Sequence, residues 1–175
     1  MPSYCEYIQS GNAAQHHIDY HDNEYGFPIE GDNELFERLV LEINQAGLSW
    51  DIILRKRATF KAAYSEFDIA TVAAYEDEDI ARLLADPGII RNRLKVQAAI
   101  ENAKRILVLQ QEFGSFKAWI EHHHPLERQE WVKLFKKQFK FTGGEIVNEF
   151  LMSCGYLSGA HDADCPVFLA LQQVS

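Results

Sequence analysis

Three features are scarce or missing in this 175-residue sequence, and each one excludes a class of protein. The chain has only three cysteines, too few for the disulfide framework of a small secreted domain. No segment approaches the roughly 20 consecutive apolar residues that a membrane-spanning helix needs. The polar start MPSYCEYIQSGN also lacks the basic and then apolar pattern of a secretory signal. We therefore expect a cytoplasmic protein with no membrane partner.

Proline is scarce as well, and the alternation typical of β-strands is missing. The five prolines, at positions 2, 28, 87, 125 and 166, fall between segments in which apolar residues recur every three or four positions. This pattern predicts a mainly α-helical fold in a single domain over residues 1–175. The expected helices lie near 32–46, 49–65, 69–75, 76–85, 92–109, 115–122, 127–138 and 145–154. Asp32 is the expected N-cap of the first of them, and Gly47 is its stop.

The net charge of −9 argues against a nucleic-acid partner when the chain is taken as a whole. Its distribution weakens that conclusion. Residues 1–51 contain ten acidic residues and one basic residue, whereas residues 52–175 contain 16 of each sign. In this neutral part the basic residues cluster within 55–61, 91–95 and 133–140. Each cluster is typical of a solvated helix face, but each could also form a local basic patch.

Four potential metal ligands lie near the two ends of the chain, as Cys5 with His21 and His161 with Cys165. Two thiolates and two imidazoles can complete a closed tetrahedral zinc shell, which is usually structural because no position is left for water. Spacing alone is weak support, since the chain has no closely spaced cysteine pair. Single buried cysteines also serve as small apolar residues, so both interpretations stay open.

A second candidate site is the predicted helix, turn and helix over residues 80–95, with Asp-Pro-Gly at its turn. A glycine turn at Gly88 can leave backbone N–H groups free at the start of the next helix, where they favour a phosphate. Arg91, Arg93 and Lys95 could hold neighbouring phosphates. The pattern fits a helix-hairpin-helix anchor for the DNA backbone, but helical hairpins with glycine turns are also common packing units.

The third candidate combines an acid with aromatic residues. Glu42 lies beside the apolar stripe of a helix expected to be buried, so its carboxylate needs a partner or a role. Trp50, Tyr20 and Tyr25 can be core aromatics, and Glu42 can be a hydrogen-bonded structural residue. A pocket with aromatic faces and one acid is, however, what an extruded nucleobase requires.

Five motifs, in order along nearly the whole chain, resemble the 3-methyladenine DNA glycosylase I family. They are Tyr20-His-Asp-Asn-Glu-Tyr-Gly26, Gln45-Ala-Gly-Leu-Ser-Trp50, Pro87-Gly-Ile-Ile-Arg91, Phe139-Lys-Phe141 and His161-x-x-x-Cys165. The resemblance implies a helix-hairpin-helix DNA glycosylase fold with the hairpin at about 76–109. It also implies one structural Zn²⁺ per chain, which ties the terminal segments 1–26 and 155–168 together.

The resemblance further implies roles for individual residues. Glu42 corresponds to the catalytic pocket acid that contacts the methylated base, and Gly47 with Leu48 to the tip that wedges into the base stack. The implied metal ligands are Cys5, His21, His161 and Cys165; the base-binding residues are Trp50, Tyr20, Tyr25 and His17; and the DNA-binding residues are Gly47, Leu48, Gly88, Ile90, Arg91 and Lys95. This chain departs from the family pattern at Glu6, Tyr7, His17 and Tyr25, which bears on the shape of the pocket.

The activity that the resemblance implies is excision of N3-methyladenine from alkylated duplex DNA by a monomeric enzyme, with 3-methyladenine as the product. No aspartate occurs between Asp86 and Asp162, which favours Glu42 over an aspartate downstream of the hairpin as the acidic group. Two alternatives stay open. One is a non-catalytic, zinc-stabilised module that binds DNA lesions, and the other is a helical protein-interaction domain without a DNA role.

Overall fold

The computed structural model describes residues 2–174, and over that range the chain forms helices joined by loops, with no strand. The α-helices are α1 (Tyr4–Gln9), α2 (Gln15–Asn23), α3 (Asp32–Gln45), α4 (Trp50–Arg55), α5 (Arg57–Ala63), α6 (Ile69–Ala73), α7 (Asp77–Leu84), α8 (Arg93–Phe113), α9 (Phe116–His123), α10 (Arg128–Gln138), α11 (Gly144–Ser153) and α12 (Pro166–Val174). A short 3-10 helix, η1, covers Ser65–Phe67. The mainly helical prediction is confirmed, although α1, α2 and α12 were not among the expected helices.

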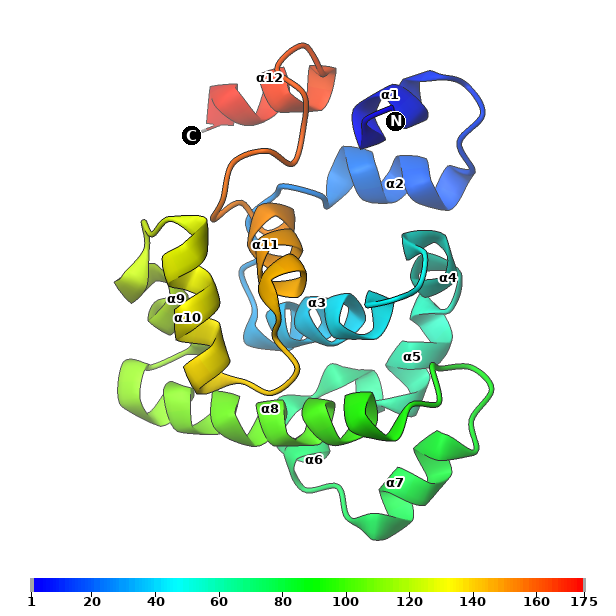
Figure 1. The fold of residues 1–175 in the computed structure, drawn as a ribbon, viewed down its shortest axis with the longest axis vertical. Coiled ribbons are helices and arrows are strands. Elements are labelled where there is room, and N and C mark those ends of the chain that lie inside the picture. Colours follow the sequence, from blue (N-terminus) through cyan, green and yellow to red (C-terminus); the bar gives the residue numbers. More distant parts are fainter. Residues whose placement is uncertain (1, 175) are drawn as a thin grey trace.

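Helix α3 lies at the centre of the molecule and packs against α4, α8, α9 and α11 (Figure 1). Its apolar residues Leu35, Phe36 and Leu39 have no exposed surface. A helix that is buried on nearly every face must find partners for each of its polar side chains. The buried polar residues of α3 are therefore the first place to look for function, and they are Glu37, Arg38, Glu42 and Asn44.

Two details differ from the sequence prediction. Asp32 is the first residue of α3, whose N-cap is Gly31, and its carboxylate instead accepts hydrogen bonds from the N–H groups of Phe116 (2.8 Å) and Lys117 (3.1 Å). It thus caps the start of α9. The expected helix 49–65 is interrupted at Lys56, whose ammonium group donates to the Pro87 carbonyl at 2.8 Å. Both contacts join segments that are distant in sequence, so local patterning could not predict them.

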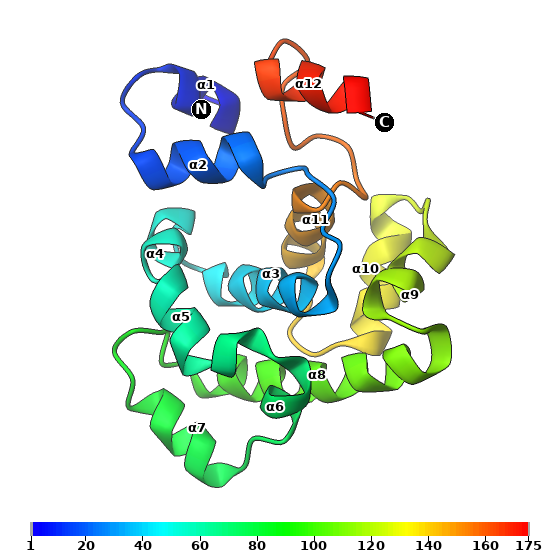
Figure 2. The ribbon, with the colours of Figure 1, turned by 180° about the vertical axis from the view of Figure 1, so that it is seen from behind.

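The remaining helices form two ends of the molecule. Helix α8 runs along one end, where it packs against α6, α7 and α9. At the other end α1, α2 and α12 form a terminal layer that contains both ends of the chain, with the start of α12 beside α1 (Figures 1 and 2). Among residues 2–174, no helix combines the length and apolar character needed to cross a membrane.

Candidate functional site

A cavity of about 760 Å³ opens in the centre of the molecule, between α3, α11 and the first two helices. Its volume is in the range of pockets that hold small ligands. Its walls come from segments that are far apart in the sequence: Tyr4, Tyr20, Tyr25, Glu42, Gln45, Ala46, Gly47, Trp50, Gly143, Gly144, Glu145, Ile146 and Glu149. The structure therefore brings together five of the residues singled out by the sequence, Tyr20, Tyr25, Glu42, Gly47 and Trp50.

One wall of the cavity is aromatic. The ring centroid of Tyr20 lies 5.8 Å from that of Tyr25 and 5.3 Å from that of Trp50, and Tyr4 meets Tyr25 edge-on at 5.7 Å. The Tyr20 hydroxyl and the Trp50 indole N–H are buried and have no hydrogen-bond partner among the described residues. Unpaired buried donors are costly, so a flat ligand with hydrogen-bond acceptors would be favoured here.

Glu42 brings an acidic group to this cavity. Only 5% of the residue is exposed, and burial together with the charge of Glu149 raises the pKa of its carboxyl group to about 8. The Arg38 guanidinium, one turn earlier on α3, opposes this rise without cancelling it. Arg38 is itself engaged by the carbonyl of Ser153 at 3.2 Å. Near neutral pH the empty cavity thus holds a carboxyl group that a cationic ligand would ionise.

Glu149 is a second acid in the cavity, which the sequence analysis did not single out. It lies on α11, and the Tyr25 hydroxyl donates to its Oε2 atom at 3.4 Å. Burial raises the pKa of Glu149, and the charge of Glu145 adds to that rise. A signal was present, because Glu149 adjoins the buried Phe150 on an apolar helix in the same way that Glu42 adjoins its own apolar stripe.

The turn after α3 forms the rim of the cavity. Gly47 has a φ of +81°, which favours glycine, and the Leu48 N–H donates to the Gln45 carbonyl at 2.7 Å. The Gln45 side-chain amide returns a hydrogen bond to the Leu48 carbonyl at 2.7 Å. Gly47 is exposed and Leu48 is half-buried, so the predicted wedge residues lie at the mouth of the cavity on a turn braced by its own hydrogen bonds.

Lys95 does not lie where the sequence prediction placed it. It is 5% exposed, and its ammonium group donates to the carbonyls of Asn44 (2.9 Å) and Ala46 (2.8 Å). These carbonyls belong to the end of α3, where a helix leaves its last carbonyl groups without partners and a cation is favoured. The structure therefore does not support the predicted phosphate contact of Lys95, because the ammonium group is engaged inside the protein.

Part of the predicted phosphate site, in the segment between α7 and α8, is accessible to solvent. Arg91 is exposed and Ile90 half-buried just before the first turn of α8. The Gly88 N–H instead donates to the Asp86 carboxylate at 2.7 Å, so the proposal that this amide faces a phosphate is not supported. Gly88 has a packing role, since a Cβ atom there would lie 2.8 Å from the Cβ of Thr59.

His17 lies behind the cavity wall rather than in it. Its Nδ1 atom is 2.8 Å from the Tyr4 hydroxyl, and its Nε2 atom is 3.0 Å from the Asp51 carboxylate. Because the carboxylate can only accept, Nε2 carries the proton and Nδ1 accepts from Tyr4. Asp51 is also bonded to His16 (2.7 Å) and Arg55 (2.7 Å), so hydrogen bonds account for this group. The predicted direct base contact of His17 is replaced by a role in positioning Tyr4.

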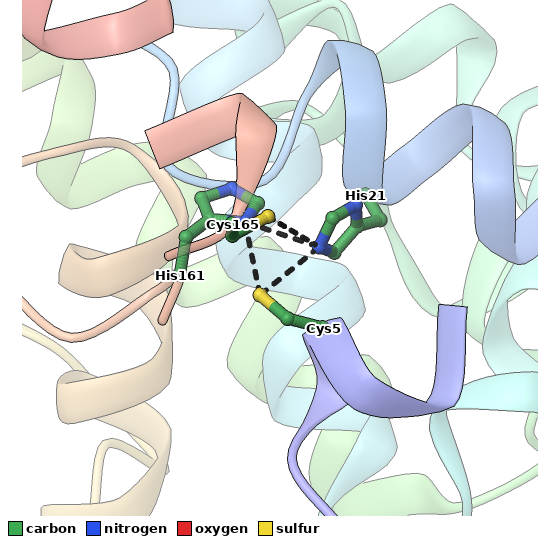
Figure 3. Close-up of side chains that lie close together, drawn as sticks. All are labelled: Cys5, His21, His161 and Cys165. Carbon is green, nitrogen blue, oxygen red and sulfur yellow. Dashed lines mark hydrogen bonds between the residues drawn. The ribbon is translucent and has the colours of Figure 1, made fainter. Parts of the chain in front are cut away.

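Cys5, His21, His161 and Cys165 are buried together in the terminal layer, as Figure 3 shows. Their ligand atoms all lie within 4.8 Å of one another. The distances between Cys5 Sγ and His21 Nε2, between Cys5 Sγ and His161 Nδ1, and between Cys165 Sγ and His21 Nε2 are 3.2, 3.5 and 3.8 Å. Ligand atoms around a tetrahedral zinc ion are separated by about 3.3–3.8 Å, so these distances are close to that range.

The hydrogen bonds around the two histidines fix which ring nitrogens face each other. His21 Nδ1 lies 2.7 Å from the Asp22 carboxylate, and His161 Nε2 is bonded to the Tyr25 carbonyl. Both oxygen atoms can only accept, so these nitrogens carry the ring protons. The other nitrogens, His21 Nε2 and His161 Nδ1, then face each other as acceptors at 3.1 Å. Two facing lone pairs repel unless a proton or a metal ion lies between them, so this arrangement is compatible with a metal ligand pair.

The cavity contains residues that the sequence analysis missed, chiefly Tyr4 and Glu149. Tyr4 precedes Cys5 on α1, a helix that the apolar periodicity did not reveal because it has only six residues. The N-cap of α11, Gly143, and two residues of its first turn, Gly144 and Ile146, also line the cavity. No local feature of the sequence identifies these residues as cavity-lining.

Several known proteins resemble this chain in sequence and in architecture. Residues 10–133 match the family model of methyladenine glycosylases. The DNA-3-methyladenine glycosylase 1 of Escherichia coli strain K12 is 38% identical over 161 residues, which cover 81% of this chain and 86% of that protein. The DNA-3-methyladenine glycosylase of Haemophilus influenzae is 32% identical over 169 residues, covering 86% of this chain and 91% of that protein.

Solved structures agree with the sequence matches. A structure of 3-methyladenine DNA glycosylase I from Staphylococcus aureus aligns with a TM-score of 0.81 at 31% identity, covering 90% of this chain and 93% of that one. A crystal structure of a variant of 3-methyladenine DNA glycosylase I in complex with 3-methyladenine also aligns with a TM-score of 0.81, at 30% identity over 90% of this chain and 94% of that one. The chain belongs to the methyladenine glycosylase family.

Proposed function

We propose that this protein is a DNA repair glycosylase that excises N3-methyladenine from alkylated duplex DNA. The observation that carries the proposal is the central cavity, where the buried carboxyl of Glu42 shares one space with the aromatic side chains of Tyr20, Tyr25 and Trp50. The names of the relatives point to the same lesion. Methylation at N3 gives the adenine of the nucleotide a positive charge, for which a carboxylate in an aromatic pocket is suited.

In the proposed reaction the bond between C1′ of the sugar and N9 of the base breaks. Its electron pair moves to N9, so the cationic base leaves as neutral 3-methyladenine. The positive charge passes to the sugar, and a water molecule adds to C1′ and gives its proton to solvent. Glu42 contacts the flipped base and stabilises the positive charge that develops on the sugar. Because the base is already a good leaving group, no strong general acid is required.

The energy for flipping the base comes from the same cavity. Unstacking a base costs a few kcal/mol, and stacking on aromatic side chains recovers about 1–3 kcal/mol for each base. Gly47 and Leu48, at the cavity mouth, are positioned to fill the gap that the base leaves in the duplex. Ile90 and the exposed Arg91, before α8, supply the backbone contacts of a helix-hairpin-helix anchor.

The four-residue cluster in the terminal layer would hold one Zn²⁺ ion through Cys5, His21, His161 and Cys165. A bound zinc ion would supply a structural crosslink and keep the thiols ionised. Without a cation, burial opposes this ionisation, because it raises the pKa of Cys5 to about 11. The cluster uses all four ligand positions and lies outside the cavity lining, so its role in the proposal is to hold the termini.

The test is release of free 3-methyladenine from methylated duplex DNA under single-turnover conditions, followed by chromatography of the released base. Wild-type protein should release it, and Glu42→Gln should release it about 100-fold more slowly. Full activity in a folded Glu42→Gln variant would contradict the role of Glu42. Tight binding of methylated DNA without any release would instead support a non-catalytic lesion-binding module.

The absence of salt-dependent DNA binding would support the third alternative, a helical protein-interaction domain. Phosphate contacts release counterions, so the proposed glycosylase must bind duplex DNA less tightly as salt rises.

A further inference from the structure

The cavity contains two carboxyl groups where one would suffice to contact a cationic base. Glu42 enters from α3 and Glu149 from α11, and both lie in the cavity lining together with Tyr20 and Tyr25. Since both side chains line one cavity, their charges interact, and after burial the charge of Glu149 is the largest contribution that raises the pKa of Glu42. The unpartnered hydroxyl of the 3% exposed Tyr20 lies in the same lining and indicates that a ligand completes this site.

The groups around the pair do not supply enough positive charge to ionise both acids. Arg38 on α3 is the cation that acts on Glu42, and it is shared with Glu24 of the preceding loop at 3.6 Å. Other groups that act with Glu42 are Tyr20 and Tyr25 from the region of α2 and Cys154 at the end of α11, and none of these is a cation.

Glu149 has a similar environment on its own side of the cavity. Tyr25 donates a hydrogen bond to it, Glu145 repels it, and Arg128 of α10 attracts it. Arg128 is already paired with the exposed Glu145 at 2.8 Å. Two nearby carboxylates with little compensating charge share a proton rather than both ionise.

We propose that Glu149 is a specificity-determining residue that forms, with Glu42, a proton-sharing pair selective for cationic bases. This inference rests on the proposed glycosylase function. In the empty cavity the pair holds one proton and one negative charge. When a methylated, positively charged base enters, the proton leaves to solvent and both carboxylates face the cation. A neutral base offers no such compensation, so the pair penalises undamaged adenine.

The first experiment measures single-turnover release of 3-methyladenine against pH for wild type, Glu149→Gln and Glu149→Asp. In Glu149→Gln the acidic limb of the profile should move down by about one pH unit, because the charge that opposes ionisation of Glu42 is gone. The rate above the limb should fall about ten-fold, because one countercharge to the cation is lost. Glu149→Asp keeps the charge and should retain the wild-type limb.

The matched control is Glu130→Gln, which removes an exposed carboxylate of α10 that does not line the cavity. Solvent screens a charge at such a position, so the profile should stay within about two-fold of wild type. If Glu149→Gln leaves both the limb and the rate at their wild-type values while Glu42→Gln is impaired, the proposed pair is disproved. A folded Glu149→Gln variant is recognised by an unchanged circular dichroism spectrum.

A second measurement separates this inference from the proposed function, because it needs no excision. The probe is 3,9-dimethyladeninium, a permanently cationic base with a methyl group in place of the sugar, and the signal is quenching of Trp50 fluorescence, with Trp50→Phe as the blank. Binding to wild type should strengthen with rising pH, and the limb should lie about one pH unit lower in Glu149→Gln. Identical limbs would overturn the inference even in a protein that excises 3-methyladenine.

Discussion

The carboxyl group of Glu42 has opposite effects on folding and on the proposed catalysis. Burial and the charge of Glu149 raise its pKa from 4.5 in the unfolded chain to about 8 in the folded protein. A group whose folded pKa is raised contributes stability that is present below its unfolded pKa and is lost as the pH rises through the folded pKa. The ionised carboxylate that the reaction needs is thus the form that destabilises the empty protein.

The substitution Glu42→Gln should therefore raise stability where it lowers activity. We expect the variant to have a higher free energy of unfolding than wild type at pH 8, with the difference shrinking toward pH 4.5, since glutamine keeps the shape without the buried charge. Urea denaturation at several pH values, followed by circular dichroism, measures this difference. A parallel pH dependence of stability in the two proteins would show that Glu42 is not the group that titrates.

At the scale of elements, the end of α3 couples the cavity to the hairpin. The last carbonyls of α3 receive the Lys95 ammonium group from the first turn of α8, and the same turn of chain carries Gly47 to the cavity mouth. Helix α3, which carries the predicted base-contacting acid, and helix α8, which belongs to the predicted DNA-backbone anchor, thus contact each other at this point. The unit formed by α7, α8 and the turn between them can thus fix the position of the turn that carries Gly47 without contacting the base.

Replacing Lys95 by methionine tests this junction. The variant should lose about 1–3 kcal/mol of stability, because charge-assisted hydrogen bonds to buried carbonyls disappear. Its excision rate should fall, while the dependence of DNA binding on salt should stay unchanged, since Lys95 makes no phosphate contact. Chemical denaturation and filter binding at several salt concentrations give both quantities. A reduced salt slope in Lys95→Met would return Lys95 to the DNA interface.

The matched comparison is Arg91→Ala, at the exposed side of the same turn. This variant should be as stable as wild type within about 0.5 kcal/mol, because surface substitutions rarely matter more. Its slope of log affinity against log salt should decrease by about one, as expected when one phosphate contact is removed. An unchanged slope would contradict the assignment of Arg91 to the DNA backbone.

At the scale of the whole molecule, the terminal layer is joined to itself by the Cys and His cluster. Figure 1 shows α1 and α2 beside α12, and the four ligands come from all three of these regions. The N-terminal and C-terminal segments therefore meet at this one group of side chains, next to the wall of the cavity. Tyr4, which directly precedes Cys5, is the cavity residue that would depend most on a crosslink at the cluster.

Purified protein should contain about one zinc ion per chain, and Cys165→Ser should lower that content sharply. Cys154→Ser is the matched control, because Cys154 is equally buried but its thiol donates to the Phe150 carbonyl outside the cluster. Removal of zinc by a chelator should speed hydrogen exchange in residues 2–26 and 160–173 while the central helices stay protected. A metal content well below one that Cys165→Ser does not change would rule out the zinc site.

The uneven charge of the chain limits its general affinity for DNA. All of the net charge of −9 is carried by residues 1–51, which form α1, α2, α3 and much of the cavity. We therefore expect weak binding to undamaged duplex, because few phosphates are neutralised, and this binding should weaken further as salt rises. Fluorescence anisotropy with an unmethylated duplex measures this affinity. Tight binding at physiological salt would contradict the expectation.

The sequence by itself determined the helical class, most helix positions and one of the acids in the cavity, Glu42. Apolar periodicity is a local property, so α3 and α8 can be recognised without the rest of the chain. Glu42 could be found for the same reason, since a carboxylate beside a buried stripe is visible in a short window. The family motifs likewise occupy short windows that need no tertiary information.

Only the tertiary structure decided which polar groups lie in the cavity and which are engaged elsewhere. Tyr4 and Glu149 lie in the cavity with Glu42 because α1 and α11 pack around α3. The Lys95 ammonium group instead donates to the Asn44 carbonyl, which is distant in the chain, and the Gly88 N–H donates to the nearby Asp86 carboxylate. The position of a side chain in a helix follows from neighbouring residues. Its hydrogen-bond partner and its pKa follow from whatever the fold places opposite it, which a short stretch of sequence does not contain.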